Sequence, residues 1–454
     1  MRIQRWLSLA VAVAVLAVAS TTPLAAQGTT TGAVTGTVTD EKNAPVPNVS
    51  VEVVNRANGA KASQITRDNG RFFIPNLEVG TYAVTARRIG FAPQTRTDIV
   101  VSLTQATRLD FQLKEQATQL AAVRTEAVAT TSDFSATRQG VQTILTDTLV
   151  RRLPTLNRDL TDLIRNSPQV NVSQDGRISA AGQNNRFNNI QIDGVSLANR
   201  FGLGASPTVG AQVGGRALPL DAIKEFQVLV SPYDVRQGNF TGALVNAVTQ
   251  SGTNEFKGSA FVYYRDQQMG RDTAFLRTSP FVRRQLGASV GGPIIKDNLF
   301  FFAAFEQTKT SRDAVRNTNS SPTYTISAAT QATSFQEIDV NVPRYLVKLD
   351  WQINDNNSLE YTRIDDKTED DRKYFGFNYA TLERTNVQKG GVSYVNWGPT
   401  PVASQQGAKV DILKYTGYLT DSLTVTALIG KTYTAHAQSP DGYDPTLPQV
   451  GFTN

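Results

Sequence analysis

The sequence predicts a mainly β protein of several parts: a small β-sandwich, then an α+β domain, then antiparallel strands of a transmembrane β-barrel. Three observations support this prediction. The chain has 454 residues, which is more than one ordinary domain needs. Short segments of alternating apolar and polar residues, separated by turns that contain glycine, recur along its length. After the N-terminus no apolar stretch reaches the length of a membrane-spanning helix, so any later crossing must use barrel strands.

The N-terminus has the three parts of a secretory signal peptide. Arg2 and Arg5 precede an apolar run over residues 6–19, and small residues follow that run. The run is shorter than the about 20 residues of a spanning helix, which argues against the alternative of an uncleaved anchor. We therefore expect residues 1–26 to be removed on export and the mature chain to begin near Gln27.

The composition excludes several classes of chemistry. There is no cysteine and a single histidine, His436, so neither thiol catalysis nor a zinc site of three or four such ligands is expected. No nucleophile elbow or phosphate-binding loop occurs. The net charge of +6 is balanced locally by acids and forms no basic block, which argues against nucleic acid as a partner. We expect no catalytic residue, no metal and no cofactor.

Residues 31–114 have the period of two that β-strands require. Val49, Val51 and Val53 fall on one face of a predicted strand, and similar faces recur up to the end of the segment. Turns such as residues 68–70 contain a glycine that supplies positive φ. We expect a small β-sandwich, since about 80 residues suffice for a modest core.

Residues 140–254 mix helix and strand signals. Leu160 and Leu163 belong to an apolar stripe at helical spacing, and Asn157 or Thr155 is the expected N-cap of that helix. Strands are predicted later in the segment, over residues 225–230 and 243–248.

A tight hairpin is predicted around Asp193 and Gly194. The two residues follow an apolar run, and Asp-Gly favours a two-residue turn with positive φ. The simplest interpretation of Asp193 is that it serves this turn alone.

Residues 256–454 alternate as barrel strands do, with lipid-facing and lumen-facing positions in turn. Hairpins are predicted from residues 345–353 with 359–364 and from residues 415–419 with 423–433. Membrane strands take about ten residues each, so the segment can supply roughly eight to ten strands. The acidic run 365–371 is expected on a long solvated loop, in preference to a calcium site.

Several of these segments together resemble one family. Residues 35–40 and 66–72 resemble the carboxypeptidase-regulatory-like fold, a transthyretin-like sandwich. Residues 217–258 resemble the end of a plug domain and the entry into a barrel, and residues 291–302 resemble a short periplasmic turn between early barrel strands. The chain thus resembles TonB-dependent outer-membrane receptors, in particular the Oar-like group with an N-terminal carboxypeptidase-regulatory-like domain.

The resemblance implies a function and a location. Such a receptor sits in the outer-membrane lipid of a Gram-negative-type bacterium. It takes up a ligand, here unidentified, through a plug-gated barrel energised by TonB and its inner-membrane motor. The alternative is a barrel-anchored surface adhesin or assembly protein, which needs no energy coupling. The family's barrels close with 22 strands, so the chain is expected to be the N-terminal part of a longer protein.

The resemblance also implies candidate functional residues. Residues 115–139 are rich in Ala, Thr, Ser and Gln and form the expected linker, where the family keeps the TonB box, an extended segment that pairs with a strand of TonB. The box candidates are Leu120, Val123, Arg124, Thr125, Glu126 and Val128. The plug-loop candidates for ligand contact are Gln183, Asn184, Asn185, Arg186, Asn199 and Arg200, with solvated loop residues as the alternative interpretation.

Overall fold

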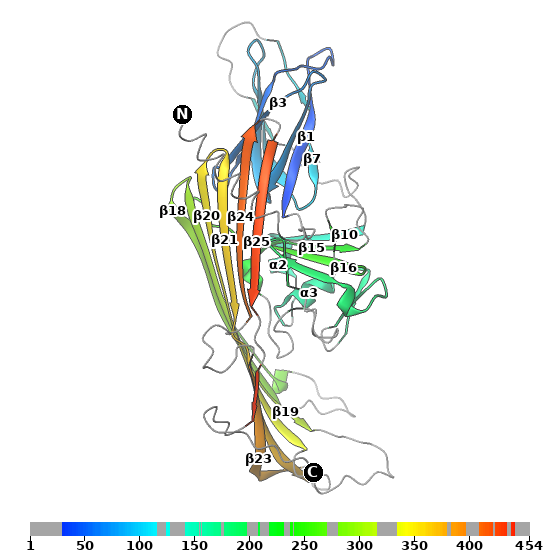
Figure 1. The fold of residues 1–454 in the computed structure, drawn as a ribbon, viewed down its shortest axis with the longest axis vertical. Coiled ribbons are helices and arrows are strands. Elements are labelled where there is room, and N and C mark those ends of the chain that lie inside the picture. Colours follow the sequence, from blue (N-terminus) through cyan, green and yellow to red (C-terminus); the bar gives the residue numbers. More distant parts are fainter. Residues whose placement is uncertain are drawn as a thin grey trace, which may run out of the picture.

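Three bodies make up the protein (Figure 1). A β-sandwich lies at one end of a long curved sheet of barrel strands, and a smaller α+β body, the plug, lies beside that sheet. The computed structural model describes residues 30–115, 124–127, 141–153, 155, 157–173, 177–197, 208, 218–230, 237–238, 240–269, 280–315, 334–378, 383–395, 408–420, 423–433 and 437–440.

The sandwich consists of two sheets. One has the order β4-β1-β7 with β8 also beside β1, and the other has the order β3-β2-β5-β6-β9. Val49, Val51 and Val53 are fully buried between the sheets, as their alternation predicts. The strands are β1 (Thr31–Thr39), β2 (Ser50–Asn55), β3 (Lys61–Ile65), β4 (Arg71–Glu78), β5 (Gly80–Arg87), β6 (Gln94–Val101), β7 (Ala106–Arg108), β8 (Phe111–Gln112) and β9 (Arg124–Ala127).

Strand β9 lies inside the predicted linker. It pairs in parallel with β6, with Thr95 opposite Thr125 and Arg96 opposite Glu126. It is the outermost strand of the described sheet. Part of the linker therefore extends the sandwich, because the edge of β6 offers backbone groups that a further strand can satisfy.

The plug is built around a five-stranded sheet of order β10-β15-β16-β13-β14. Central strands β15 and β16 are almost wholly buried, as the two apolar segments predict. The elements are β10 (Val141–Thr146), α2 (Asp147–Arg152), α3 (Leu160–Ile164), β11 (Val170–Val172), β12 (Ile178–Ala180), η1 (Asn185–Phe187), β13 (Asn189–Ile192), β14 (Val195–Ser196), η3 (Leu220–Ala222), β15 (Ile223–Val230) and β16 (Ala243–Thr249).

Two local predictions for the plug have different outcomes. The tight hairpin is confirmed: Asp193 and Gly194 link β13 to β14 with φ values of 46° and 84°. The predicted cap of helix α3 is wrong. The cap is Asp159, whose side chain accepts a hydrogen bond from Asp162 N, so the helix begins at Leu160.

The barrel part is a single ten-stranded antiparallel sheet, at the upper end of the predicted number. Along its path β21 pairs with β24, while β22 pairs with the first half of β20. The strands are β17 (Lys257–Asp266), β18 (Phe281–Ile295), β19 (Leu299–Val315), β20 (Phe335–Asn354), β21 (Asn357–Asp366), β22 (Glu369–Asn378), β23 (Glu383–Val395), β24 (Ala408–Thr420), β25 (Leu423–Tyr433) and β26 (Ala437–Pro440).

The two faces of the barrel sheet differ in chemistry. On β20 the outward residues Tyr345, Val347 and Trp351 are 42%, 44% and 45% exposed. The alternate residues, which include Arg344 and Lys348, are buried. Apolar outward and polar inward alternation is typical of a strand between lipid and a lumen. Among the described residues, no helix has the length and apolarity needed to cross a membrane.

The acidic run 365–371 is not on a long loop. Strand β21 ends at Asp366 and β22 begins at Glu369, so two residues separate them. Thr368 and Asp370 are buried, because the run turns back onto the inner face of the sheet. The charged residues at the two ends of the run belong to strands β21 and β22. A prediction from charge content alone cannot detect these strands.

Candidate gating site at the plug–barrel contact

The plug packs against the inner face of the barrel sheet. One continuous apolar cluster joins plug residues such as Phe226 and Val245 to barrel residues such as Phe302, Leu346 and Ile412. Polar contacts between the two bodies lie around Glu306, around Asp193 and around Asn157, whose side-chain oxygen accepts a hydrogen bond from Arg283 Nη1 of β18 at 2.6 Å.

Glu306 is the centre of the first contact. It lies on β19 directly opposite Arg344 of β20, and both side chains are fully buried. Arg344 Nη2 donates to Glu306 Oε1 at 2.6 Å. A buried ion pair of this kind needs further hydrogen bonds to offset the cost of desolvation.

The plug supplies those further contacts. Arg158 Nε lies 3.7 Å from Glu306 Oε1, and Leu220 N donates to Glu306 Oε2 at 3.4 Å. Arg344 Nη1 in turn donates to Leu218 O of the plug at 3.0 Å. One carboxylate of the barrel wall thus binds two separate plug segments.

Arg158 contacts the wall at Phe261 as well as at Glu306, and an acidic residue of the plug holds it in place. It forms an ion pair of 2.8 Å with Asp221 within the plug. Its guanidinium lies 4.0 Å from the ring centroid of Phe261 on β17. Its backbone is left-handed, with φ of 51°, a conformation that non-glycine residues seldom adopt.

Asp193 forms the second contact and does more than close its turn. Its Oδ1 accepts from Thr249 N at 2.9 Å, and its Oδ2 accepts from Thr249 Oγ1 at 2.6 Å. Oδ2 also accepts from Thr362 Oγ1 of barrel strand β21 at 3.2 Å. The hairpin turn, the end of β16 and the barrel wall therefore share one carboxylate.

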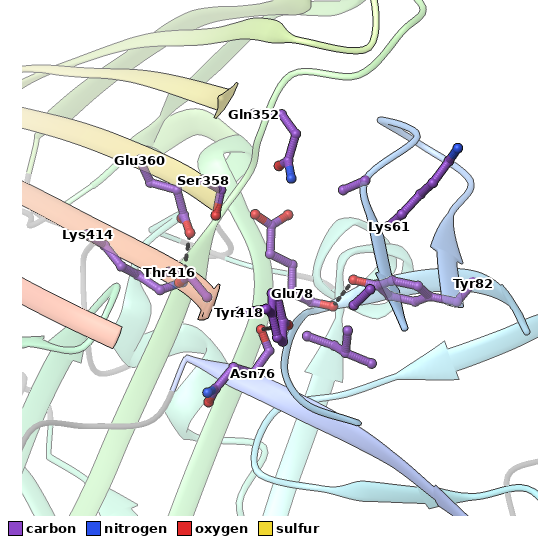
Figure 2. Close-up of a pocket in the computed structure, with 13 residues that line it drawn as sticks. Lys61, Asn76, Glu78, Tyr82, Gln352, Ser358, Glu360, Lys414, Thr416 and Tyr418 are labelled. Carbon is purple, nitrogen blue, oxygen red and sulfur yellow. Dashed lines mark hydrogen bonds and ion pairs between the residues drawn. The ribbon is translucent and has the colours of Figure 1, made fainter. Parts of the chain in front are cut away.

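A row of charges lines the barrel wall beside Asp193. Glu360 of β21 lies 3.3 Å from Lys348 Nζ and accepts a hydrogen bond from Lys414 Nζ at 2.7 Å. Figure 2 shows this end of the wall meeting the sandwich, and the labelled side chains there are Lys61, Asn76, Glu78, Tyr82, Gln352, Ser358, Glu360, Lys414, Thr416 and Tyr418.

Glu225 of β15 is a buried plug carboxylate on the side facing the sandwich. Its Oε1 accepts a hydrogen bond from Leu103 N of the sandwich at 2.8 Å. Burial raises the pKa of Glu225 to about 7, while the Leu103 N–H and the charge of Lys224 act to lower the pKa.

Only three of the six predicted ligand-contact residues lie together on the surface of the plug in the part of the chain that the structure describes. Gln183, Asn184 and Arg186 are exposed around η1. Asn185 is 7% exposed, and its Oδ1 accepts from Ile178 N at 3.1 Å, so its carboxamide serves the plug interior. Asn199 and Arg200 lie outside the described residues.

Only some of the predicted TonB-box residues belong to the part of the chain that the structure describes. Arg124, Thr125 and Glu126 lie in β9, on the edge of the sandwich. The box candidates outside the described residues are Leu120, Val123 and Val128.

Sequence reasoning missed the residues of the first contact. Glu306 and Arg344 both occupy inward positions of alternating strands, and this alternation is a signal that they face the lumen. It does not reveal that the register places them opposite each other. Arg158 and Asp221 carry no motif at all.

Comparison with known proteins agrees with this division into three bodies. Residues 33–114 match the carboxypeptidase regulatory-like domain. Residues 134–244 match the TonB-dependent receptor plug domain, and residues 248–339 match an outer membrane β-barrel domain.

Similar proteins include transporters and receptors. The TonB-dependent transporter Oar of Myxococcus xanthus is 27% identical over 303 residues, which cover 63% of this chain and 27% of Oar. The probable TonB-dependent siderophore receptor PirA of Acinetobacter baumannii is 26% identical over 208 residues, which cover 42% of this chain and 26% of PirA. The matched part therefore spans about a quarter of the length of these curated relatives.

Among solved structures, the outer membrane transporter YddB from Escherichia coli aligns with a TM-score of 0.46 at 16% identity, over 66% of this chain and 40% of that chain.

A plug fastened to the inner face of an antiparallel barrel sheet defines a plugged outer-membrane barrel protein. The chain combines a carboxypeptidase regulatory-like domain, a TonB-dependent receptor plug domain and an outer membrane β-barrel domain, and it is similar to the TonB-dependent transporter Oar. The curated proteins that it resembles are named as a transporter and a receptor.

Proposed function

We propose that the chain acts in energised uptake of a ligand across the outer membrane, with the plug as the gate. The observation that carries this proposal is the contact around Glu306. It fastens the plug to the wall through ion pairs and hydrogen bonds, with a wide apolar contact beside it. Such polar contacts exchange with water once a pull separates them, so the plug can leave the wall and return without unfolding the barrel.

The energy for opening comes from TonB and its inner-membrane motor. TonB pairs with the extended segment at residues 120–128 by adding a strand. The signal peptide at residues 1–26 directs export, and the mature protein resides in the outer membrane. Gln183, Asn184 and Arg186 contact the ligand, together with Asn199 and Arg200. The exposure of the first three supports their part in this proposal.

Loss of the Arg158 contacts tests the gating proposal. Cells that produce the full-length receptor with Arg158→Ala should become sensitive to vancomycin, a large antibiotic that an intact outer membrane excludes. Arg165→Ala is the matched control, since Arg165 is an exposed plug arginine. Equal sensitivity of both variants and wild type would contradict the gate and favour a barrel-anchored adhesin.

A further inference from the structure

The sandwich has an interaction surface for the plug. Leu103 N donates to Glu225 at 2.8 Å, and Gln227 Nε2 donates to Thr104 Oγ1 at 2.8 Å. Val79 and Leu103 of the sandwich form a small buried apolar cluster with Val248 of β16. This cluster is separate from the core of the sandwich, so its apolar area is buried by docking.

The same sandwich also contacts the barrel. Tyr418 of β24 donates its hydroxyl to Pro75 O at 3.0 Å, and its ring packs against the sandwich core. Asn254, between the plug and the first barrel strand, donates its backbone N–H to Ala57 O at 2.9 Å. Asn254 is tied to the barrel as well, because its side chain donates to Asp297 in the β18–β19 turn at 2.7 Å.

One compact domain therefore bridges two bodies that must separate if the plug is to open. The loop before β7 contacts the plug through Leu103 and Thr104. The end of β4 contacts the barrel rim at Tyr418, which Figure 2 shows beside Asn76. Contacts of one rigid domain with both partners stabilise their relative position, because moving either one breaks part of the contact.

We propose that the carboxypeptidase-regulatory-like domain is an intramolecular clamp. Its partner is the plug and barrel rim of the same chain, and while docked it holds the plug against the barrel wall. Undocking of the sandwich is then a step that precedes release of the plug.

A disulfide tests the docking itself, because the chain has no cysteine of its own. Ala57→Cys with Asn254→Cys places a thiol on each of the two residues whose backbones share the 2.9 Å hydrogen bond between the sandwich and the start of the barrel. In the purified full-length receptor this pair should oxidise nearly completely. Ile89→Cys with Asn254→Cys is the control, since Ile89 is fully exposed at a turn of the sandwich. Crosslinking of the first pair at the control's level would overturn the docking.

Hydrogen exchange tests the clamp and needs neither a ligand nor TonB, so its result is independent of the uptake proposal. Leu103→Ala with Tyr418→Phe removes contacts from both sides of the interface and leaves the plug sequence unchanged. Amides of β15 and β16 should exchange at least tenfold faster in this variant. The oxidised Ala57→Cys/Asn254→Cys receptor should exchange at the wild-type rate or more slowly. Ile89→Ala is the matched control and should resemble wild type.

Amides of β2 and β5, in the sandwich interior, report whether the variant domain remains folded. If they stay protected while β15 and β16 exchange as in wild type, the sandwich does not hold the plug and the clamp is refuted. If they lose protection and β15 and β16 do not, the sandwich has unfolded without loosening the plug, which refutes the clamp equally.

Discussion

Glu225 makes docking of the sandwich depend on pH. Its pKa is about 7 in the docked state, against 4.5 for an unperturbed glutamate, and the facing groups are Leu103 N–H and Lys224. The docked state therefore holds a proton that the released state loses between these two values. The contribution of Glu225 to docking should be fully present at pH 4.5 and below, fall by up to about 3 kcal/mol as the pH rises to about 7, and stay constant above that.

The measurement is the protection factor of β15 amides at pH 5 and pH 8, which corrects for the intrinsic exchange rate. Wild type should lose protection at least tenfold on going to pH 8. Glu225→Gln should show little change, because an amide of the same shape does not titrate. If Glu225→Gln lost as much protection between pH 5 and pH 8 as wild type does, the pH dependence would belong to another group.

Asp193 should contribute to the stability of the plug beyond its turn. Asp193→Ala removes acceptors from Thr249 and Thr362 and puts alanine at a left-handed φ, so we expect the opening free energy of β13 and β16 to fall by about 2–3 kcal/mol. Hydrogen exchange of those strands measures the loss. Asp98→Ala is the control, read out on its own strands β5 and β6, since Asp98 has a similar φ of 61° and an exposed side chain. An equal effect in both variants would show that only the turn conformation matters.

At the scale of elements, the strands that alternate or that are continuously apolar could be predicted from sequence. The sequence pattern predicts strands β15, β16 and β25 to within two residues, and the Asp-Gly pair predicts the tight hairpin with positive φ that joins β13 to β14. Each of these signals is local, since it depends on a face or a turn formed by neighbouring residues.

Other elements could not be predicted, because their cause lies elsewhere in the chain. Helix α2 is a single short helix with one buried residue, Val150, which leaves no periodic stripe. Strand β9 exists because β6 has an edge available to it. The contact of Glu306 with Arg158 depends on how the plug sits in the barrel, and sequence spacing holds no information on that.

The β19–β20 pair offers a test of how the wall holds the plug. Arg344→Met alone leaves Glu306 buried without its strongest partner and should destabilise the plug–barrel contact by about 3–5 kcal/mol. Arg344→Met together with Glu306→Leu should cost less, since no charge is then left uncompensated. Unfolding of the full-length receptor in urea, monitored by hydrogen exchange of the β15 amides, gives the loss of stability for the single and for the double variant. A double variant less stable than the single one would contradict a role for the unpaired charge.

At the scale of the whole molecule, the three described bodies are attached to one another in sequence. Strand β9 lies at the edge of the sandwich, the sandwich contacts the plug and the barrel rim, and the plug contacts the barrel wall. A pull on residues 124–127 therefore acts on the sandwich through the pairing of β9 with β6, and on the plug through the chain that leads on to β10.

We propose that the chain couples to TonB through the linker. The most direct test of this coupling is binding of the purified periplasmic domain of TonB to the full-length receptor. Val123→Pro and Val128→Pro each remove a backbone donor from the proposed pairing and should raise Kd at least tenfold. Ser132→Pro, in the same linker but outside the box candidates, should bind as wild type does. Absence of binding by wild type, or an equal Kd for all three proline variants, would contradict the account.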